Sequence, residues 1–129
     1  MNASLVKEMA LKTLKPISVL LLGFVAFYLV IGMAPLDPKN IAWLSNGDPA
    51  QHFLGWHFFR NSEWGFPIGV NPRYGIDLSA GIVFSDSIPL FAFIFKVLSP
   101  FLPDIFQYSG LWLLSCFVLQ SYFSWKLVG

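Results

Sequence analysis

An uncharged run from Ile17 to Ala34 constrains this chain more than any other sequence feature. Its 18 residues would measure about 27 Å as a helix, close to the roughly 30 Å core of a bilayer. The charges before it are Lys7, Glu8, Lys12 and Lys15. Because positive charge favours the cytoplasmic side, we predict a cytoplasmic N-terminus over residues 1–16 and transmembrane helix 1 over residues 17–34.

A cleaved signal peptide is the alternative interpretation of this run. Gly32 and Ala34 have the small-x-small spacing of a cleavage site. The run is longer than the apolar part of a typical signal, which has about 7 to 15 residues. Pro35 would also directly follow the cut bond, which is a poor geometry for processing. We therefore favour a retained membrane helix.

The composition points to the same class of protein. Hydrophobic residues make up 56% of the 129 residues and charged residues 12%, whereas soluble domains carry about 25% charged residues. The net charge of +1 gives no reason to expect a nucleic-acid partner, so membrane lipids are the expected surroundings. Cys116 is the single cysteine and lies in an apolar run, which excludes an internal disulfide and favours a packing role.

Two further apolar segments follow later in the sequence. Residues 88–103 are predicted to form a short transmembrane helix 2, although Lys96 interrupts the run and Pro100 should end the helix after about 18 Å. The alternative is an element that re-enters without crossing. We favour a crossing because Lys96 lies where a cytoplasmic end is expected. Residues 105–127 are predicted to form transmembrane helix 3. The expected fold class is all-α membrane, with about three transmembrane helices.

Residues 35–87 are predicted to form a long exterior loop that is rich in aromatic residues and turn formers. Such long loops are usually functional or disordered, and the aromatic residues argue against disorder. Asp48 as N-cap and Pro49 as first helical residue predict a helix near 48–60. That helix is too apolar to stand free in water, so we expect an interfacial amphipathic helix. Residues 65–75 contain many breakers and are predicted to be irregular.

Three segments of this region carry a resemblance to a known family. They read GDPAQHFLGW over Gly47–Trp56, NPRYG over Asn71–Gly75 and SDSIPL over Ser85–Leu90. They resemble a bacterial family of large multi-pass membrane proteins, a domain of unknown function that is itself similar to the C-type (GT-C) glycosyltransferase superfold. The resemblance runs from Pro16 onward and implies the N-terminal part of a longer protein of the bacterial inner membrane.

The resemblance also implies an activity, the transfer of a sugar from a polyprenyl-phosphate donor at the exterior membrane face. The remaining helices of the parent protein would be partners, and the fragment alone would be inactive. Asp48 matches the acidic residue that acts as catalytic base or metal ligand in the first exterior loop of these glycosyltransferases. A carboxylate at a helix start should stay ionised, which suits an orienting or metal-binding role.

A divalent metal ion is the cofactor that these residues suggest. His52 lies one helical turn after Asp48, and Asp86 lies where the loop returns to the membrane, so the three form a candidate metal site. The plainer alternatives are that Asp48 and Asp86 cap helices and that His52 is satisfied by a neighbouring hydrogen bond.

The candidate substrate-binding residues are Gln51, His57, Arg60, Arg73 and Tyr74. Arg60 and Arg73 could hold a lipid phosphate, because a guanidinium group binds two phosphate oxygens at once. Alternatively, both are ordinary interfacial arginines, and Tyr74 belongs to the aromatic belt of a membrane surface.

Two other function classes fit parts of the sequence. A transporter or flippase component would need ionisable groups inside the membrane, and the predicted helices hold mainly weak polar groups besides Lys96. A non-enzymatic membrane scaffold would need the exterior loop only for its shape, and would tolerate replacement of Asp48.

Overall fold

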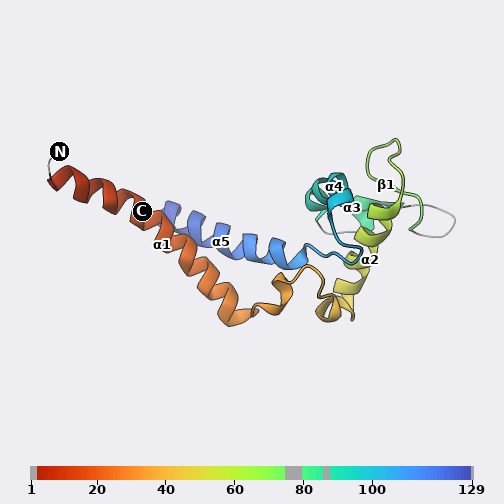
Figure 1. Ribbon diagram of the computed structural model, residues 1–129, viewed down its shortest axis with the longest axis horizontal. Helices are drawn as coiled ribbons and strands as arrows, with labels where there is room; N and C mark the ends of the chain where they lie inside the picture. Colours follow the sequence, from red (N-terminus) through yellow and green to blue (C-terminus); the bar gives the residue numbers. More distant parts are fainter. Residues whose placement is uncertain (1–2, 75–79, 86–87, 129) are drawn as a thin grey trace. The chain divides into compact units, whose positions relative to one another are not determined.

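A computed structural model describes residues 3–74, 80–85 and 88–128, with side chains from residue 14 onward. The described part is mostly helical (Figure 1). Close contacts divide the chain into two compact units, unit 1 (Met1–Asp37 and Ser109–Gly129) and unit 2 (Pro38–Tyr108). In chain order the elements are α1 (Ala3–Val30), η1 (Ala34–Leu36), η2 (Ala42–Leu44), α2 (Asp48–Asn61), β1 (Val70–Asn71), β2 (Ala80–Gly81), α3 (Ile82–Ser85), α4 (Pro89–Val97), η3 (Ser99–Phe101) and α5 (Ser109–Val128).

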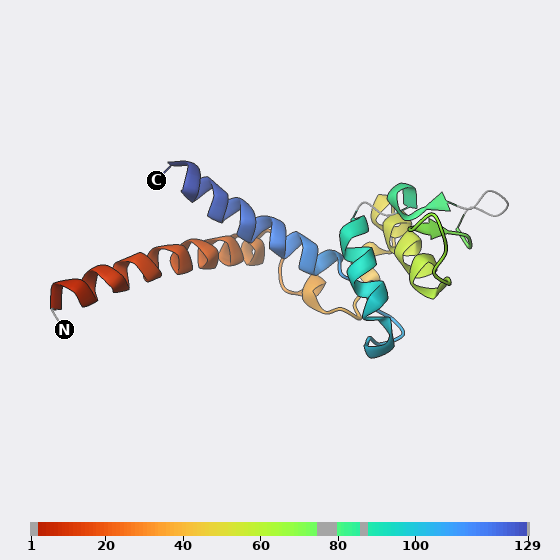
Figure 2. The same ribbon diagram turned by 90° about the horizontal axis from the view of Figure 1, so that it is seen from above.

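In unit 1, α1 and α5 run antiparallel and cross closely (Figures 1 and 2). A Cβ atom added to Gly23 would lie 2.8 Å from the backbone oxygen of Phe117, so the backbones nearly touch there. The hydroxyl of Ser121 donates to the backbone oxygen of Val19 at 2.9 Å. Phe27 is fully buried and meets the ring of Phe117 edge-on. Small residues and a hydrogen bond are typical of helix pairs that associate in lipid.

Within the described residues, α5 is the one helix that is long and apolar enough to cross a membrane. None of its apolar stretch is buried, which sets it apart from the core helix of a soluble protein. Residues Leu14–Val30 of α1 form a shorter apolar helix. A lone helix of this kind is weak evidence for membrane association, because length and composition alone define it.

The ends of these helices differ from the predicted spans 17–34 and 105–127. α1 begins at Ala3, so the helix extends through the lysine-rich residues and through Pro16. It ends before Gly32, which has a φ of 84° that a glycine tolerates best. Helix α5 begins only at Ser109.

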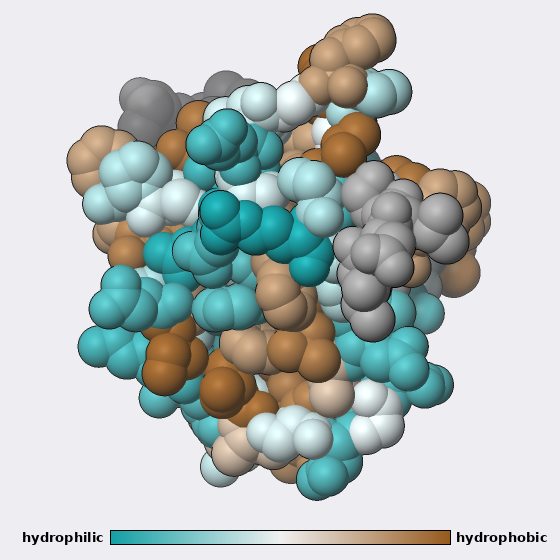
Figure 3. Space-filling model, turned by 90° about the vertical axis from the view of Figure 1, so that its right-hand side faces the viewer, coloured by the Kyte–Doolittle hydropathy of each residue, from teal (hydrophilic) through white to brown (hydrophobic). Residues whose placement is uncertain are grey.

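Unit 2 is built around one hydrophobic cluster that joins α2, α4 and the chain before α5. The indole nitrogen of Trp56 donates to the backbone oxygen of Phe106 at 2.9 Å, and Tyr108 stacks on Phe95. Hydrophobic side chains also reach the surface of unit 2 between hydrophilic ones (Figure 3). The buried members of the cluster are Trp56, Phe59, Ile82, Ala92, Phe106 and Tyr108.

The two ends of unit 2 lie side by side. The backbone N–H of Gln107 donates to the backbone oxygen of Pro38 at 2.8 Å. In unit 1, just outside these ends, Gly110 packs directly against the carbonyl group of Pro35. Unit 2 therefore begins and ends at neighbouring points of the backbone.

The helix predicted near 48–60 is confirmed as α2 (Asp48–Asn61). Its N-cap, however, is Gly47 with a φ of 68°, and Asp48 is the first helical residue. The helix therefore begins one residue earlier than predicted, because glycine accepts a positive φ at the N-cap position.

A short two-stranded sheet was missed by the all-α prediction. β1 and β2 pair antiparallel, with Asn71 opposite Ala80. Asn71 is fully buried, and its side-chain nitrogen donates to the backbone oxygen of Gly55 at 3.0 Å. The segment predicted to be irregular is thus anchored to α2 through one asparagine.

Helix α4 is shorter than the range 88–103 that was predicted for transmembrane helix 2. Its nine residues measure about 13 Å, well short of the roughly 30 Å core of a bilayer. Its N-cap is Ile88. Ser87 and Asp86, the residues expected to cap it, lie outside the described residues.

Lys96 of α4, which was predicted to lie at the cytoplasmic end of a crossing helix, is buried within unit 2, with 5% of its surface exposed. Its Nζ donates to the backbone oxygen of Phe59 at 2.7 Å and to the hydroxyl of Ser62 at 3.1 Å. It also lies over the rings of Phe59 and Trp64. Burial lowers the pKa of Lys96. The lysine thus binds the C-terminal end of α2, where carbonyl groups attract a cation.

Candidate functional site

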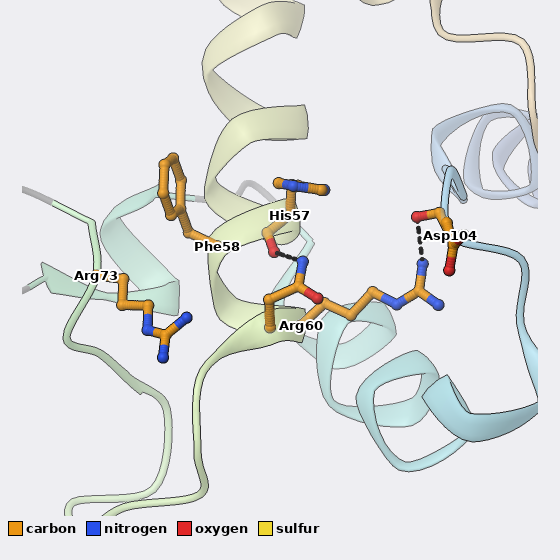
Figure 4. A pocket seen from close by; sticks show the side chains of 6 residues that line it. His57, Phe58, Arg60, Arg73 and Asp104 are labelled. Atoms are coloured by element: carbon orange, nitrogen blue, oxygen red, sulfur yellow. Dashed lines mark hydrogen bonds between the residues drawn. The ribbon is translucent and has the colours of Figure 1, made fainter.

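A pocket of about 400 Å³ opens beside the last two turns of α2 (Figure 4). α2 supplies most of its wall, the turn after β1 supplies one arginine, and the segment before α5 supplies a carboxylate. The lining contains two guanidinium groups and one carboxylate, so its fixed charge is positive. The lining residues are His57, Phe58, Arg60, Asn61, Arg73 and Asp104.

The Arg60 side chain is occupied by backbone carbonyl groups. Its Nη1 donates to the oxygens of Pro103 at 2.7 Å and Asp104 at 3.0 Å. Its Nη2 donates to the oxygens of Leu102 at 3.3 Å and Ser99 at 3.4 Å. Arg60 therefore ties α2 to residues 99–104 and brings positive charge to the pocket, while most of its N–H groups are already used.

Arg73 differs from Arg60 in its exposure and in its hydrogen bonds. It is exposed, and it has no hydrogen bond or ion pair with any residue that the structure describes. Figure 4 shows it reaching the pocket from the turn after β1, while Arg60 extends toward Asp104. The buried Asn71 holds this turn against α2. Among the described residues, the guanidinium group of Arg73 is therefore not engaged, and its turn is held by Asn71, which suits a phosphate or carboxylate ligand.

His57 contributes an exposed imidazole on the α2 side of the pocket. Its ring contacts the rings of Phe53 and Phe58, which limit its movement. Phe58 in turn meets the ring of Tyr74 edge-on, with the ring centres 5.8 Å apart. Tyr74 therefore supports the wall of the pocket through Phe58.

The structure brings together three of the predicted substrate-binding residues, His57, Arg60 and Arg73, around one pocket. Asp48 and Gln51 do not line it and are exposed near the start of α2. His57 lies nine residues after Asp48, which corresponds to about 13 Å along the helix axis. A ligand group in the pocket is therefore out of direct reach of the Asp48 carboxylate.

The candidate metal site is not assembled by the described residues. No group of three His, Cys, Asp or Glu side chains within them is placed to hold a metal ion. His52 is partly buried, and its Nδ1 has no hydrogen-bond partner among the described residues. Asp86, the third predicted ligand, lies outside the described residues. We therefore derive no chemical step from a metal ion.

Sequence reasoning missed Phe58, Asn61 and Asp104 as pocket residues. Asp104 follows Pro103 and looked like a simple break between apolar segments. It reaches the pocket because Arg60, 44 residues earlier, binds its backbone oxygen. Asn61 has its own local role, since its side-chain nitrogen donates to the backbone oxygen of His57 at 2.8 Å. No local pattern signals such a contact between distant segments.

Comparisons with known proteins identify one relationship. Residues 20–129 match the model of a protein family described as a domain of unknown function, DUF6311. Neither the curated proteins nor the solved structures contain a match to this chain. Since the matched residues make up most of the chain and include both units, this chain belongs to the DUF6311 family.

Proposed function

We propose that this chain is the N-terminal part of an integral membrane, glycosyltransferase-like protein. It would transfer a sugar from a polyprenyl-phosphate donor at the exterior face of the membrane. The pocket of unit 2 would hold the phosphate of that donor. The observation that carries the proposal is the exposed guanidinium of Arg73, which no described residue engages, in a pocket with positive fixed charge.

The pocket has the chemical groups that a phosphate monoester or diester needs. Arg73 offers paired N–H donors, and the fixed charge of Arg60 adds attraction without rearrangement. His57 can donate a further hydrogen bond from its ring. These groups would stabilise the negative charge that stays on the phosphate when the bond from the sugar to the phosphate oxygen breaks.

The acceptor hydroxyl must lose a proton as its oxygen bonds to the sugar. Asp104, the carboxylate on the pocket wall, would lie near the phosphate and accept this proton. Asp48 is proposed as a carboxylate that orients the acceptor, on the resemblance to the acidic motif of glycosyltransferases. Because the attacked carbon is bonded to the phosphate and Asp48 lies about 13 Å along α2 from His57, Asp48 would bind a part of the acceptor remote from the reacting hydroxyl.

The test is binding of a short polyprenyl phosphate to the purified protein, with the matching polyprenol as the ligand that lacks phosphate. We expect Arg73→Gln to weaken phosphate binding about tenfold or more, because a hydrogen bond to a charged group contributes roughly 1.5 to 3 kcal/mol. Lys39→Gln removes the same charge outside the pocket and should leave binding unchanged. Binding of the polyprenol should respond to neither change.

Asp48→Asn separates the two proposed roles, because asparagine keeps the shape of aspartate. It should leave donor binding unchanged and lower sugar transfer by about 10² or more, because a poorly oriented acceptor reacts more slowly. Equal binding of the polyprenyl phosphate by the Arg73→Gln protein and the unchanged protein would refute the phosphate site. Full sugar transfer by the Asp48→Asn protein would refute a role of Asp48 in the reaction and leave it with a structural role at the start of α2.

A further inference from the structure

Helix α4 exposes an apolar stripe made of large hydrophobic side chains. Each member has another member three or four residues away, so they share one face of the helix, which continues into η3. Leu90 is 68% exposed and Phe101 is 87% exposed. Figure 2 shows α4 and η3 along one side of unit 2. We define the apolar stripe as Leu90, Ile94, Val97, Leu98 and Phe101.

The one charged side chain of α4, Lys96, lies on the face opposite the apolar stripe. Ala92 is fully buried, and Lys96 turns into unit 2 to bind the end of α2. The apolar stripe therefore carries no charged side chain of its own. A short helix with one apolar face and a cation held away from it is suited to the surface of a bilayer.

The chain itself brings a bilayer within reach of the apolar stripe. Phe101 lies eight residues before Ser109, where α5 begins, so the two are at most about 29 Å apart along an extended chain. Helix α5 is long and apolar enough to cross a membrane. The chain therefore limits the distance between the stripe and a membrane that α5 would cross, and an exposed apolar patch marks a surface that is normally covered.

We infer that the apolar stripe inserts into the lipid interface and holds unit 2 against the membrane without crossing it. This inference rests on the membrane location that the proposed function assigns to the chain. It gives α4 a role different from transmembrane helix 2, namely that of an interfacial anchor. It also places the pocket of unit 2 on a body that rests on the same membrane from which a lipid-linked donor would come.

The experiment uses the full chain with Cys116→Ser and a single new cysteine in the stripe, Val97→Cys or Phe101→Cys. Each protein is labelled with an environment-sensitive fluorophore and reconstituted into vesicles of phosphatidylcholine and phosphatidylglycerol. The control is Gly65→Cys, an exposed position of unit 2 with no neighbouring atoms within 4 Å of an added Cβ. Both labelled stripe positions are exposed, so neither change disturbs the buried cluster.

The stripe labels are expected to show blue-shifted emission and strong quenching by a doxyl-labelled phosphatidylcholine, but little quenching by iodide. The Gly65→Cys label should show the reverse pattern. Quenching of the stripe labels by iodide overturns the inference, and so does shielding from both quenchers, because another protein surface would then cover the stripe. Carbonate extraction of the same vesicles separates failure of the anchor from failure of the membrane location. Release of the chain by carbonate would disprove the membrane location as well. A chain that stays in the membrane while iodide quenches its stripe labels would disprove the anchor alone.

Discussion

Gly55 occupies a position in α2 that no larger residue can share, because the carbonyl group of Ser85 lies where a Cβ atom would be. The absence of a side chain lets α3 come directly against the helix and lets the buried Asn71 bind the backbone oxygen of Gly55. Gly110 fills the same kind of position against the carbonyl group of Pro35 in unit 1. These glycines are therefore needed for close contact between backbones, and not for chain flexibility.

Gly55→Ala is predicted to destabilise unit 2 by about 1 to 3 kcal/mol, because the added methyl group must push a backbone segment away. Thermal unfolding of the purified protein in detergent, followed by circular dichroism, measures the change. Gly65→Ala adds the same methyl group where nothing lies within 4 Å, and should change stability by less than about 0.5 kcal/mol. Equal unfolding temperatures for the two variants would show that α2 and α3 are not packed as described.

At the scale of whole elements, two cationic side chains connect the C-terminal end of α2 to other segments of unit 2. Lys96 from α4 binds the backbone oxygen of Phe59 in the last turn. Arg60, in the same turn, reaches out to the carbonyl groups before α5. Two cations thus fix the end of the helix that forms the pocket wall, where the helix dipole also favours positive charge.

The burial of Lys96 makes the stability of unit 2 depend on pH. Burial lowers the pKa of Lys96 below its value of 10.5 in the unfolded chain. At pH below the lowered pKa, the ammonium group is charged in both states and its burial opposes folding. As pH rises from the lowered pKa toward 10.5, the folded state releases its proton first, so stability should increase in this window.

Lys96→Met removes the titrating amine and is therefore predicted to abolish this increase of stability with pH. The measurement is the difference in unfolding temperature between the unchanged protein and the variant across this alkaline range. As pH rises, the unfolding temperature of the unchanged protein should increase relative to that of Lys96→Met. The variant Lys39→Met, at an exposed position, should show no such trend. A difference that stays constant with pH would contradict a buried Lys96.

The sequence was a good guide to α2 and a poor guide to α4. The turn formers before Pro49 are local signals, so the start of α2 was predicted within one residue. Lys96 looked like the charged end of a crossing helix, because nothing local shows that a lysine will bind carbonyl groups 37 residues away. The same limit applies to the pocket. His57, Arg60 and Arg73 were recognised by residue type, but only the fold shows that backbone carbonyl groups bind Arg60 and that none of the described residues binds Arg73.

At the scale of the whole molecule, unit 1 is a pair of antiparallel apolar helices, and unit 2 is the chain between them. If both helices cross a membrane, the chain after α1 and the chain before α5 emerge on the same side. By the positive-inside rule, the lysines before the apolar part of α1 would then place that side at the exterior. The pocket of unit 2 would then face the compartment in which lipid-linked sugars are used as donors in the proposed function.

This topology predicts the reaction of single cysteines with a reagent that cannot cross membranes. In a Cys116→Ser background, a cysteine introduced by Gly65→Cys should react in intact cells, because Gly65 is exposed in unit 2. A cysteine introduced by Ser4→Cys should react only after the cells are opened. The opposite labelling pattern would place unit 2 in the cytoplasm and disprove the exterior location.

The hydrogen bond between Gln107 and Pro38 has an evolutionary consequence. A segment whose two ends meet can be lengthened, shortened or replaced without changing the distance that its neighbours must bridge. The residues of unit 1 on either side of this segment are held together by their own contact, between Gly110 and Pro35. We expect unit 2 to behave as an exchangeable module, so that members of the family keep the helix pair while the inserted body diverges to suit different ligands.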